Sequence, residues 1–353
     1  MKNKPLLKQQ IFLFAIITTL FCGCYTEQWS TSRENSLPVE ISIDVIKPPY
    51  IQIPTSIKKV LIIDFSLYKN KRFAQRDEAQ QLNRNYFLDS LASEYFVSQL
   101  ISFIDTTTRY EIVRPQKNHY ENADSLRWKD IADLCNQYKV DAVIALDQLA
   151  LNLRVHTTAQ NNLWYPVSYT SYNEMAIMDV EIIANWKFFN PAARRAIDKY
   201  TFNYKRSFTQ QARSGDAAID FLPSAKKIVK TAGQISAKRY ARRIAPYWMR
   251  LQREYYAIGN SDMQLAKSLI DKNKWDEATA IWLNNSLNAD KDVARRCNYN
   301  LILAYEVQGD IEKAFNQARA TYKTYNNDEA KIYMRRLQQR LKDKQLLEKQ
   351  FGN

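Results

Sequence analysis

Residues Lys58–Phe65 read KKVLIIDF, and this stretch decides which fold to expect. Its apolar side chains run from Val60 to Phe65 and are interrupted only by Asp64. A strand with one face in water alternates apolar and polar residues, whereas a strand covered on both faces has no need to alternate. The stretch therefore predicts a buried strand in a sheet with helices packed on it.

The segments that follow support this prediction. Apolar residues at helical spacing predict a helix over Asn83–Ile104, and Tyr110–Val113 has the pattern of a short strand. Ser125 can cap a second helix that runs through Tyr138, and Val140–Leu146 is again a buried strand. We expect the inward side of the second helix to carry Trp128, Ile131, Leu134, Cys135 and Tyr138. The order β-α-β-α-β over residues 58–146 predicts a sheet with helices packed on it.

After residue 146 the pattern changes to strict alternation, which predicts long antiparallel strands with one buried face. Alternation covers Leu151–Val155, Met178–Phe188 and Tyr200–Tyr204, and Val39–Val45 shows it near the start of the chain. A long helix is expected over Ala217–Tyr256, kinked or split in two at Pro246.

This order of elements resembles the periplasmic domain shared by the curli secretion channel lipoprotein and the amino-terminal domain of TolB. The features that match are the LIIDF strand, VDAVIALDQL, the long hairpin and the closing helix, over residues 39–256. The resemblance implies an α/β (α+β) domain with a mixed sheet and flanking helices. The whole chain also resembles a lipoprotein family of Bacteroidota, in which this domain is followed by helical repeats.

Residues 261–323 contain an internal repeat with a period of 36 residues. The first copy comprises Leu265, Leu269, Asn273, Trp275, Ala278 and Trp282, and the second Leu301, Tyr305, Gly309, Ile311, Ala314 and Ala318. The spacing resembles the tetratricopeptide repeat, and the alternative is a plain pair of helical hairpins. Residues 328–348 are expected to cap the array with a polar helix, and the array to pack on the end of the long helix.

The amino terminus has the pattern of a secretory signal, with an apolar run, Ile11–Phe21, that is too short to span a bilayer. Phe21-Cys22-Gly23-Cys24 resembles a bacterial lipobox, which implies cleavage before Cys24 and a lipid on its sulfur. The alternative is an ordinary signal peptide. The expected organisation is a signal peptide (1–23), a tether (24–38), the α/β domain (39–256) and a tetratricopeptide-like domain (257–353).

Composition excludes several classes of site. The six glycines are widely separated, which excludes a dinucleotide fingerprint, a phosphate loop and a nucleophile elbow. The chain has two histidines and neither HExxH nor CxxC, so no metal or cofactor is expected. Cys135 and Cys297 are expected to be buried thiols rather than one long-range disulfide. The net charge is +14. In a protein with a secretory signal, such a charge favours binding to anionic lipid or glycan, or merely solubility, over binding to nucleic acid.

Two surfaces are candidate binding sites. The stretch 161–172, NNLWYPVSYTSY, places aromatic side chains between two expected strands. They either contact a partner or a glycan, or they cover the sheet. Those rings belong to Trp164, Tyr165, Tyr169 and Tyr172. The expected helix over Lys226–Arg253 has nine basic residues, which form either a solvated face or a contact with anionic lipid headgroups. The candidates for that contact are Lys238, Arg239, Arg242 and Arg243.

These observations favour a lipid-anchored, non-catalytic binding or scaffolding subunit of a cell-envelope assembly at the outer membrane, on its periplasmic side or at the cell surface. Its expected contacts are the membrane, through the lipid, and an envelope protein. The alternatives are a glycan-binding lipoprotein of a polysaccharide-uptake system and an envelope hydrolase. The hydrolase would need acids such as Asp64 and Asp147 to converge at strand ends.

Overall fold

The structure, a computed structural model, describes residues 38–66, 86–107, 109–115, 126–160 and 173–351. They cluster into two compact units. Among the described residues, the sheet unit comprises those within Ile46–Trp248 and 345–351, and the helical unit comprises 38–45 and Met249–Lys344. The predicted fold class, a mixed sheet with helices followed by an all-helical region, is confirmed.

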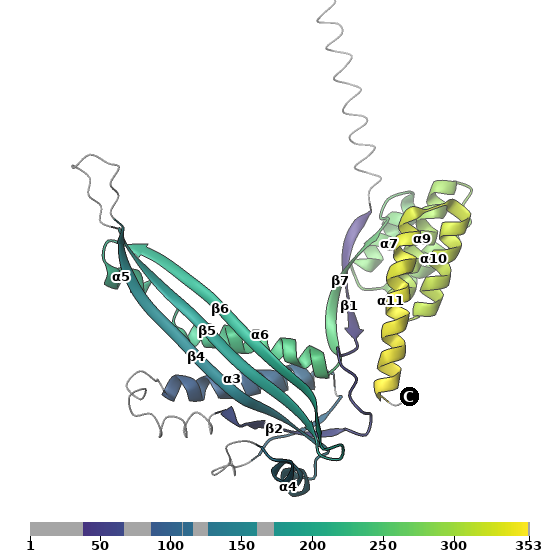
Figure 1. Ribbon diagram of the computed structural model, residues 1–353. Coiled ribbons are helices and arrows are strands. Elements are labelled where there is room, and N and C mark those ends of the chain that lie inside the picture. Colours follow the sequence, from purple (N-terminus) through teal and green to yellow (C-terminus); the bar gives the residue numbers. More distant parts are fainter. Residues whose placement is uncertain (1–37, 67–85, 108, 116–125, 161–172, 352–353) are drawn as a thin grey trace, which may run out of the picture. The chain divides into compact units, whose positions relative to one another are not determined.

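The sheet unit is built on a five-stranded mixed sheet in the order β3-β2-β4-β5-β6 (Figure 1). Its strands are β2 (Lys59–Asp64), β3 (Glu111–Val113), β4 (Ala142–Gln160), β5 (Asn173–Asn190) and β6 (Arg195–Ala212). Its helices are α3 (Tyr86–Asp105), α4 (Trp128–Tyr138), α5 (Gly215–Asp220) and α6 (Ala225–Ile244). β2 runs parallel to β3 and β4, and the other pairs are antiparallel. The predicted β-α-β-α-β order is therefore confirmed.

β2 is covered on both faces, as its sequence predicts. Val60 and Ile62 enter the core under α3 and α6, and Leu61 and Ile63 enter a second core with α4. All four side chains are buried. The absence of alternation in KKVLIIDF thus reflects a strand between two helical layers.

The three later strands form a long ribbon with one apolar face. β4 is one strand of 19 residues, so the predicted segments Val140–Leu146 and Leu151–Val155 belong to a single element. The buried residues of β5, from Ala176 to Phe188, alternate and pack against the core beneath α3 and α6. Gly233 permits α6 to approach α3, because a Cβ there would lie 2.8 Å from Phe96 Cδ2.

The helix expected over Ala217–Tyr256 breaks before Pro246, where a kink or split was predicted, but the prediction of helix beyond that proline is wrong. α6 ends at Ile244, and the next residue, Ala245, has an extended backbone (φ −137°, ψ 151°). Pro246 explains the change, because a proline disfavours helical backbone in the residue before it and cannot donate a helical hydrogen bond. The chain beyond it forms β7 (Tyr247–Tyr255), which pairs with β1 (Val39–Lys47).

The second predicted helix forms as α4, with two corrections. It starts at Trp128 and is preceded by Arg127, whose backbone N–H donates to Asp130 Oδ2 over 2.9 Å; Ser125 lies outside the described residues. Trp128 was expected to face inward but is 40% exposed, and its ring forms a T-shaped pair with Phe189, with ring centres 5.8 Å apart. Ile131, Leu134 and Cys135 are buried as predicted.

The helical unit stacks five helices against the β1–β7 pair. They are α7 (Ser261–Ile270), α8 (Trp275–Asn285), α9 (Lys291–Val307), α10 (Ile311–Tyr325) and α11 (Asp328–Phe351), which includes the predicted capping helix. Ser42 contacts Gln252 and Asp44 contacts Arg250, so residue numbers rise on one strand as they fall on the other, as in an antiparallel pair. Ile43, Val45 and Tyr255 join the helices in one core.

The internal repeat corresponds to two helical hairpins, α7–α8 and α9–α10. Asn273 and Gly309, the matching turn positions of the two copies, both have positive φ (58° and 85°). The small residues Ala278 and Ala314 are fully buried, as expected for closely packed helices. The array was expected to pack on the end of a long helix, but it packs on β7, because that segment is a strand.

Cys135 and Cys297 are buried free thiols, as predicted. Burial raises the pKa of the Cys135 thiol to about 11 and that of the Cys297 thiol to about 12. Both side chains therefore serve as small apolar groups in their cores.

Candidate functional site

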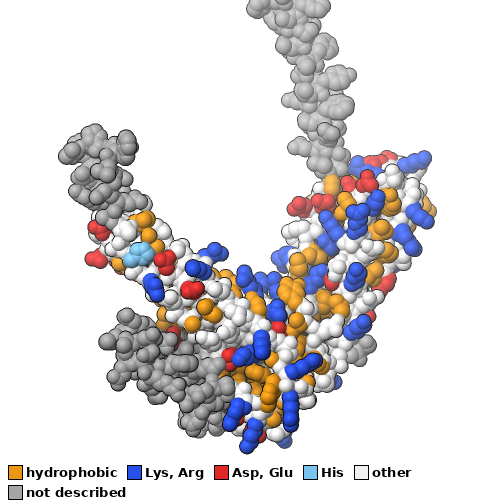
Figure 2. All heavy atoms as spheres, viewed as in Figure 1, with side chains coloured by type: hydrophobic (Ala, Val, Ile, Leu, Met, Phe, Trp, Pro, Cys, Tyr) orange, Lys and Arg blue, Asp and Glu red, His pale blue; other side chains and the backbone are white. Residues whose placement is uncertain are grey.

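The candidate surface of the sheet unit is the polar face of the ribbon β4–β5–β6. α3 and α6 lie along the opposite face, as Figure 1 shows. α4 packs against Leu61, Val143 and Phe189, near the base of the ribbon. Farther along the strands, acidic, basic and histidine side chains are mixed on the visible surface (Figure 2).

Cross-strand register arranges these polar residues in rows. One row is Asn152–Glu181–Lys205, and the next is Arg154–Asp179–Ser207. Residues opposite each other in a sheet have Cβ atoms about 5 Å apart, so each row brings an acid beside a basic or neutral polar group.

A hollow of about 320 Å³ lies over these two rows. Ser207 Oγ donates to Asp179 Oδ1 over 2.5 Å, which fixes one wall of the hollow. Arg154, Lys205 and Ser207 are exposed, so the hollow is a shallow polar site accessible to solvent. Such a surface suits recognition of a polar or charged segment better than burial of a small apolar ligand.

The outer edge of the ribbon is also available. β6 is 18 residues long and pairs with β5 on one side, and no strand among the described residues pairs with its other side. Backbone N–H and C=O groups along such an edge can pair with another extended chain. Long edge strands are usually shortened, covered or charged, and β6 uses charge through Arg195, Lys199, Lys205 and Arg206.

The basic face predicted from the sequence lies on α6, and the structure divides its residues. Lys238 and Arg239 are exposed, and the Arg239 guanidinium lies 5.8 Å from the centre of the Phe202 ring. The Arg242 guanidinium lies 4.9 Å from the centre of the Tyr247 ring. Arg243 instead forms a bidentate ion pair with Asp198, with N–O distances of 2.9 and 2.7 Å.

Arg250 and Arg253 lie on β7 and not on the basic helix to which the sequence assigned them. Arg250 forms an ion pair with Asp44, and Arg253 forms one with Glu306. Arg243, Arg250 and Arg253 are therefore structural groups. Of the nine predicted basic residues, the six that form no ion pair with a carboxylate of the described residues all belong to α6.

Asp64 and Asp147 each have a partner of their own. Asp64 Oδ1 accepts hydrogen bonds from the backbone N–H and the hydroxyl of Ser66, over 3.0 and 2.7 Å. Asp147 is buried at an irregularity in β4 and lies 2.9 Å from Lys187 Nζ. These contacts hold strand ends and a bulge in place, which is a structural use of both carboxylates.

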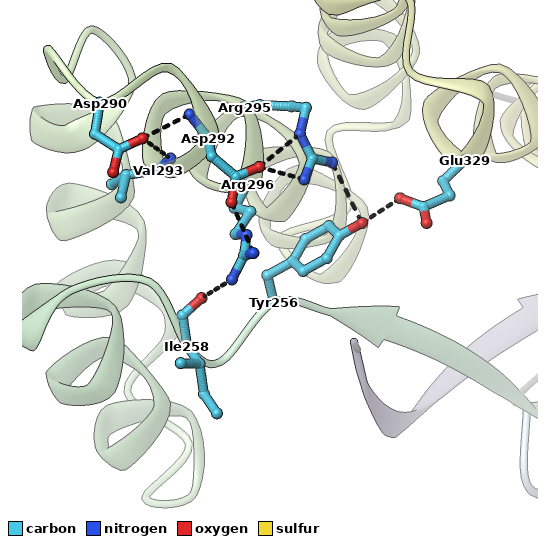
Figure 3. A network of polar contacts seen from close by, with 8 residues as sticks. All are labelled: Tyr256, Ile258, Asp290, Asp292, Val293, Arg295, Arg296 and Glu329. Carbon is cyan, nitrogen blue, oxygen red and sulfur yellow. Dashed lines mark hydrogen bonds and ion pairs between the residues drawn. The ribbon is translucent and has the colours of Figure 1, made fainter. Parts of the chain in front are cut away.

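A polar network in the helical unit joins the end of β7 to the start of α9 (Figure 3). Arg295 and Arg296 both bind Asp292, over 2.6 and 2.7 Å, and Arg296 also donates to the Ile258 carbonyl over 2.7 Å. The Tyr256 hydroxyl donates to Glu329 and accepts from Arg295. Burial, followed by the bond to Glu329, raises the pKa of Tyr256. Each of these side chains contacts another residue of the unit, so the network ties the end of β7 to α9 and α11.

Several candidates from the sequence lie outside the described residues. They are Cys24 with its signal and tether, and the rings of Trp164, Tyr165, Tyr169 and Tyr172. In the part of the chain that is described, no group of three His, Cys, Asp or Glu side chains could hold a metal ion. No helix there is both long and apolar enough to cross a membrane.

The open face has a signal in the amino-acid sequence. Alternation in β4–β6 marks the polar members of each strand as one face, and this pattern predicts that the face is open. It does not say which residues become neighbours, because cross-strand register depends on bulges such as the one between Leu146 and Gln148.

Residues 57–256 match the family described as a domain of unknown function (DUF8603), which covers more than half of the 353-residue chain. The chain belongs to this family. Its DUF8603 region contains the sheet, α3–α6, the open face and β7. Residues 264–341, which contain most of the stacked helices, match a second domain of unknown function (DUF6340).

Comparison with curated proteins gives no match. Among solved structures, the DUF8603 chain is similar to a homolog of the neuraminyllactose-binding hemagglutinin from Helicobacter pylori. That similarity has 13% identity and a TM-score of 0.29, and it covers 55% of this chain and 87% of the other. A PelC dodecamer from Paraburkholderia phytofirmans matches with 5% identity and a TM-score of 0.20, over 56% of this chain and 97% of the other.

Proposed function

We propose that this protein is a non-catalytic binding or scaffolding subunit of a cell-envelope assembly, anchored at the outer membrane by a lipid on Cys24. It acts by adding an extended segment of a partner protein to the edge of its sheet. The observation that carries the proposal is the ribbon β4–β5–β6, which combines an unpaired edge with an open polar face.

The length of the ribbon supports this use. Its three strands have 19, 18 and 18 residues, whereas strands in globular proteins usually have about 5–6. Strand addition takes its affinity from main-chain hydrogen bonds and its specificity from side chains beside the edge. The hollow beside Lys205 supplies such side chains.

Charge favours an acidic partner segment over a second copy of this chain. β6 has four basic residues, and Asp198, its acid, is already held by Arg243. Two β6 edges side by side would bring lysines and arginines together, which is unfavourable. An acidic strand would instead face Lys199 and Lys205.

Structural use of the ionisable groups supports a non-catalytic role. Asp147 and Glu306 are buried acids, and each forms an ion pair that stabilises its unit. A general acid or base must instead reach a substrate proton.

The test is site-specific photo-crosslinking in cells. A crosslinking amino acid at Asn203 or Thr209, both exposed on β6, is expected to capture one protein in high yield. The same probe at Gln137, exposed on α4, is the matched control and should not capture it. The double substitution K199E and K205E should abolish capture. Equal capture at Gln137, or capture that survives the charge reversal, contradicts the proposal, and capture of glycan alone favours the polysaccharide-uptake alternative.

The anchor is tested separately by metabolic labelling with an alkyne palmitate analogue. We expect the wild-type protein to be labelled and to fractionate with membranes, and the Cys24→Ser variant to be unlabelled. An unlabelled wild type refutes the anchor but leaves the crosslinking result meaningful.

A further inference from the structure

α6 carries an unusual excess of positive charge. Its 20 residues include seven basic side chains and no acidic one. Arg243 forms an ion pair with Asp198, and in the described part of the chain the other six have no carboxylate within ion-pair distance. Lys226 and Lys227 lie in the first turn, where a positive charge opposes the helix dipole and costs about 0.3–1 kcal/mol. Helix stability alone does not favour this distribution.

Four of these six cations form a row on the solvent side of α6, interrupted by the neutral Gln234. The residues of the row are three or four positions apart, which places them on one face of a helix. They are Lys227, Lys230, Gln234, Lys238 and Arg242. From Lys227 to Arg242 the row spans about 22 Å, at 1.5 Å per residue. We call this surface the α6 face.

The α6 face has a fixed orientation. The opposite side of the helix is buried against the sheet, where Tyr240 stacks on Trp186 with ring centres 5.3 Å apart. At the end of the helix, the Ile244 carbonyl accepts a hydrogen bond from the Tyr110 hydroxyl over 2.6 Å. The helix cannot rotate its cations away from solvent without losing this packing.

Aromatic side chains adjoin the carboxyl end of the α6 face. The Tyr50 backbone N–H donates to the Arg242 carbonyl over 3.1 Å, which holds residue 50 against the last turn of the helix. The Tyr50 ring meets the Tyr247 ring edge-on with centres 5.9 Å apart, and the Arg242 guanidinium lies over Tyr247. Tyr50 is 63% exposed, although it is large and partly apolar.

Apolar exposure also occurs at the other end of the helix. Phe221, four residues before α6 begins, is 66% exposed, and Ile219 is exposed beside it. Exposed rings next to a row of lysines and arginines are the composition of protein surfaces that rest on a membrane interface.

We infer that the α6 face binds the headgroups of an anionic membrane surface. The row offers a linear array of cations without internal counterions, which matches the spread charge of a headgroup layer. Tyr50 and Phe221 supply rings for the interfacial region. This inference rests on the envelope placement in the proposed function but not on the lipid at Cys24 or on the partner at β6.

The expected strength follows from the number of free cations. Each basic residue near an anionic leaflet contributes about 1 kcal/mol, which is about fivefold in affinity. Removal of three lysines should therefore weaken binding roughly a hundredfold. Added salt should weaken wild-type binding as well, because it screens exposed charges.

The experiment is co-sedimentation of the mature, unacylated Cys24→Ser chain with vesicles. One set is phosphatidylcholine alone, and the other contains added phosphatidylglycerol. The test variant is K227Q, K230Q and K238Q, and the matched control is K58Q, K129Q and K139Q, three exposed lysines outside α6. Far-UV circular dichroism confirms that each variant is folded.

We expect binding only to the anionic vesicles, lost in the α6 variant and retained in the control. Equal binding to both kinds of vesicle, or equal loss in both variants, overturns the inference. No binding by the wild-type chain also overturns it, whereas the crosslinking result at β6 would stand. A second variant, Tyr50→Ser, should weaken binding severalfold without changing the net charge, and an unchanged affinity removes the aromatic part of the inference.

Discussion

Replacing Glu306 with glutamine should destabilise the helical unit more than any surface substitution of the same kind. Glu306 is fully buried, and its carboxylate receives two hydrogen bonds from Arg253, over 2.8 and 2.9 Å. The Tyr333 hydroxyl donates a third over 2.7 Å. Burial opposes ionisation of Glu306, but the hydrogen bonds from Arg253 and Tyr333 and the charge of Arg340 overcome it and lower the pKa of the carboxyl.

The magnitude follows from the charge left behind. In the Glu306→Gln variant, Arg253 keeps its charge with only 6% of its side chain exposed. Removing one partner of such a buried pair costs about 3–5 kcal/mol. Replacing both partners, as in Arg253→Met with Glu306→Leu, removes the buried charge of Arg253, while Arg340, 3.4 Å from Glu306 and 12% exposed, loses its contact with that carboxylate. The Tyr333 hydroxyl is also left without its acceptor, at about 1–3 kcal/mol. Adding Tyr333→Phe should recover most of that loss.

The assay is urea unfolding followed by far-UV circular dichroism, with each of the three variants compared with the wild type. The matched control is Glu312→Gln, which breaks an exposed ion pair with Lys344 at 3.0 Å in the same unit. That change should cost less than about 1 kcal/mol. If Glu306→Gln costs no more than the control, or if the double variant is less stable than the single one, the reasoning about the buried pair is refuted.

Three further predictions concern pH, backbone and thiols. The pKa of Glu306 is lower in the folded chain than the unfolded value of 4.5, so its carboxylate stabilises the folded state fully above pH 4.5. This stabilisation is lost as the pH falls through the folded pKa. Urea midpoints measured from neutral to acidic pH should therefore fall less in Glu306→Gln than in the wild type. Gly309→Ala should lower the free energy of unfolding in urea by about 1–2 kcal/mol, because residue 309 has φ 85°, and with open space around it the cost comes from the backbone alone. Asn273→Gly should change stability little. An equal cost for both substitutions would contradict the turn assignment. In a chain without Cys22 and Cys24, alkylation of Cys135 and Cys297 should be slow until urea unfolds the units, because burial raises both thiol pKa values, and rapid alkylation of the folded chain would show that the cores open.

The elements that the sequence predicts well are those whose local pattern matches their tertiary surroundings. KKVLIIDF predicts a strand covered on both faces, and alternation predicts the hairpin, because each residue in these stretches has one dominant environment. The repeat is visible for the same reason, since small and turn residues recur at 36 residues.

The failures arise where distant chain segments decide the structure. Residues Tyr247–Tyr255 include Trp248, Leu251 and Tyr255, which also fit one side of a helix, and the strand forms because β1 pairs with it. The open face was missed because its neighbours are set by register, which a single strand does not encode. Arg243 could not be separated from the free basic residues, because Asp198 lies 45 positions earlier in the chain.

The pairing of β1 with β7 has a consequence for synthesis. Asp44 and Arg250 are 206 residues apart, so the first strand emerges long before its partner exists. Until then the chain cannot close the core that holds Ile43 and Val45. A polypeptide synthesised from its amino terminus must therefore keep this apolar strand unpaired while the whole sheet is made. We expect chaperones to shield it during that delay, since exposed unpaired strands promote aggregation.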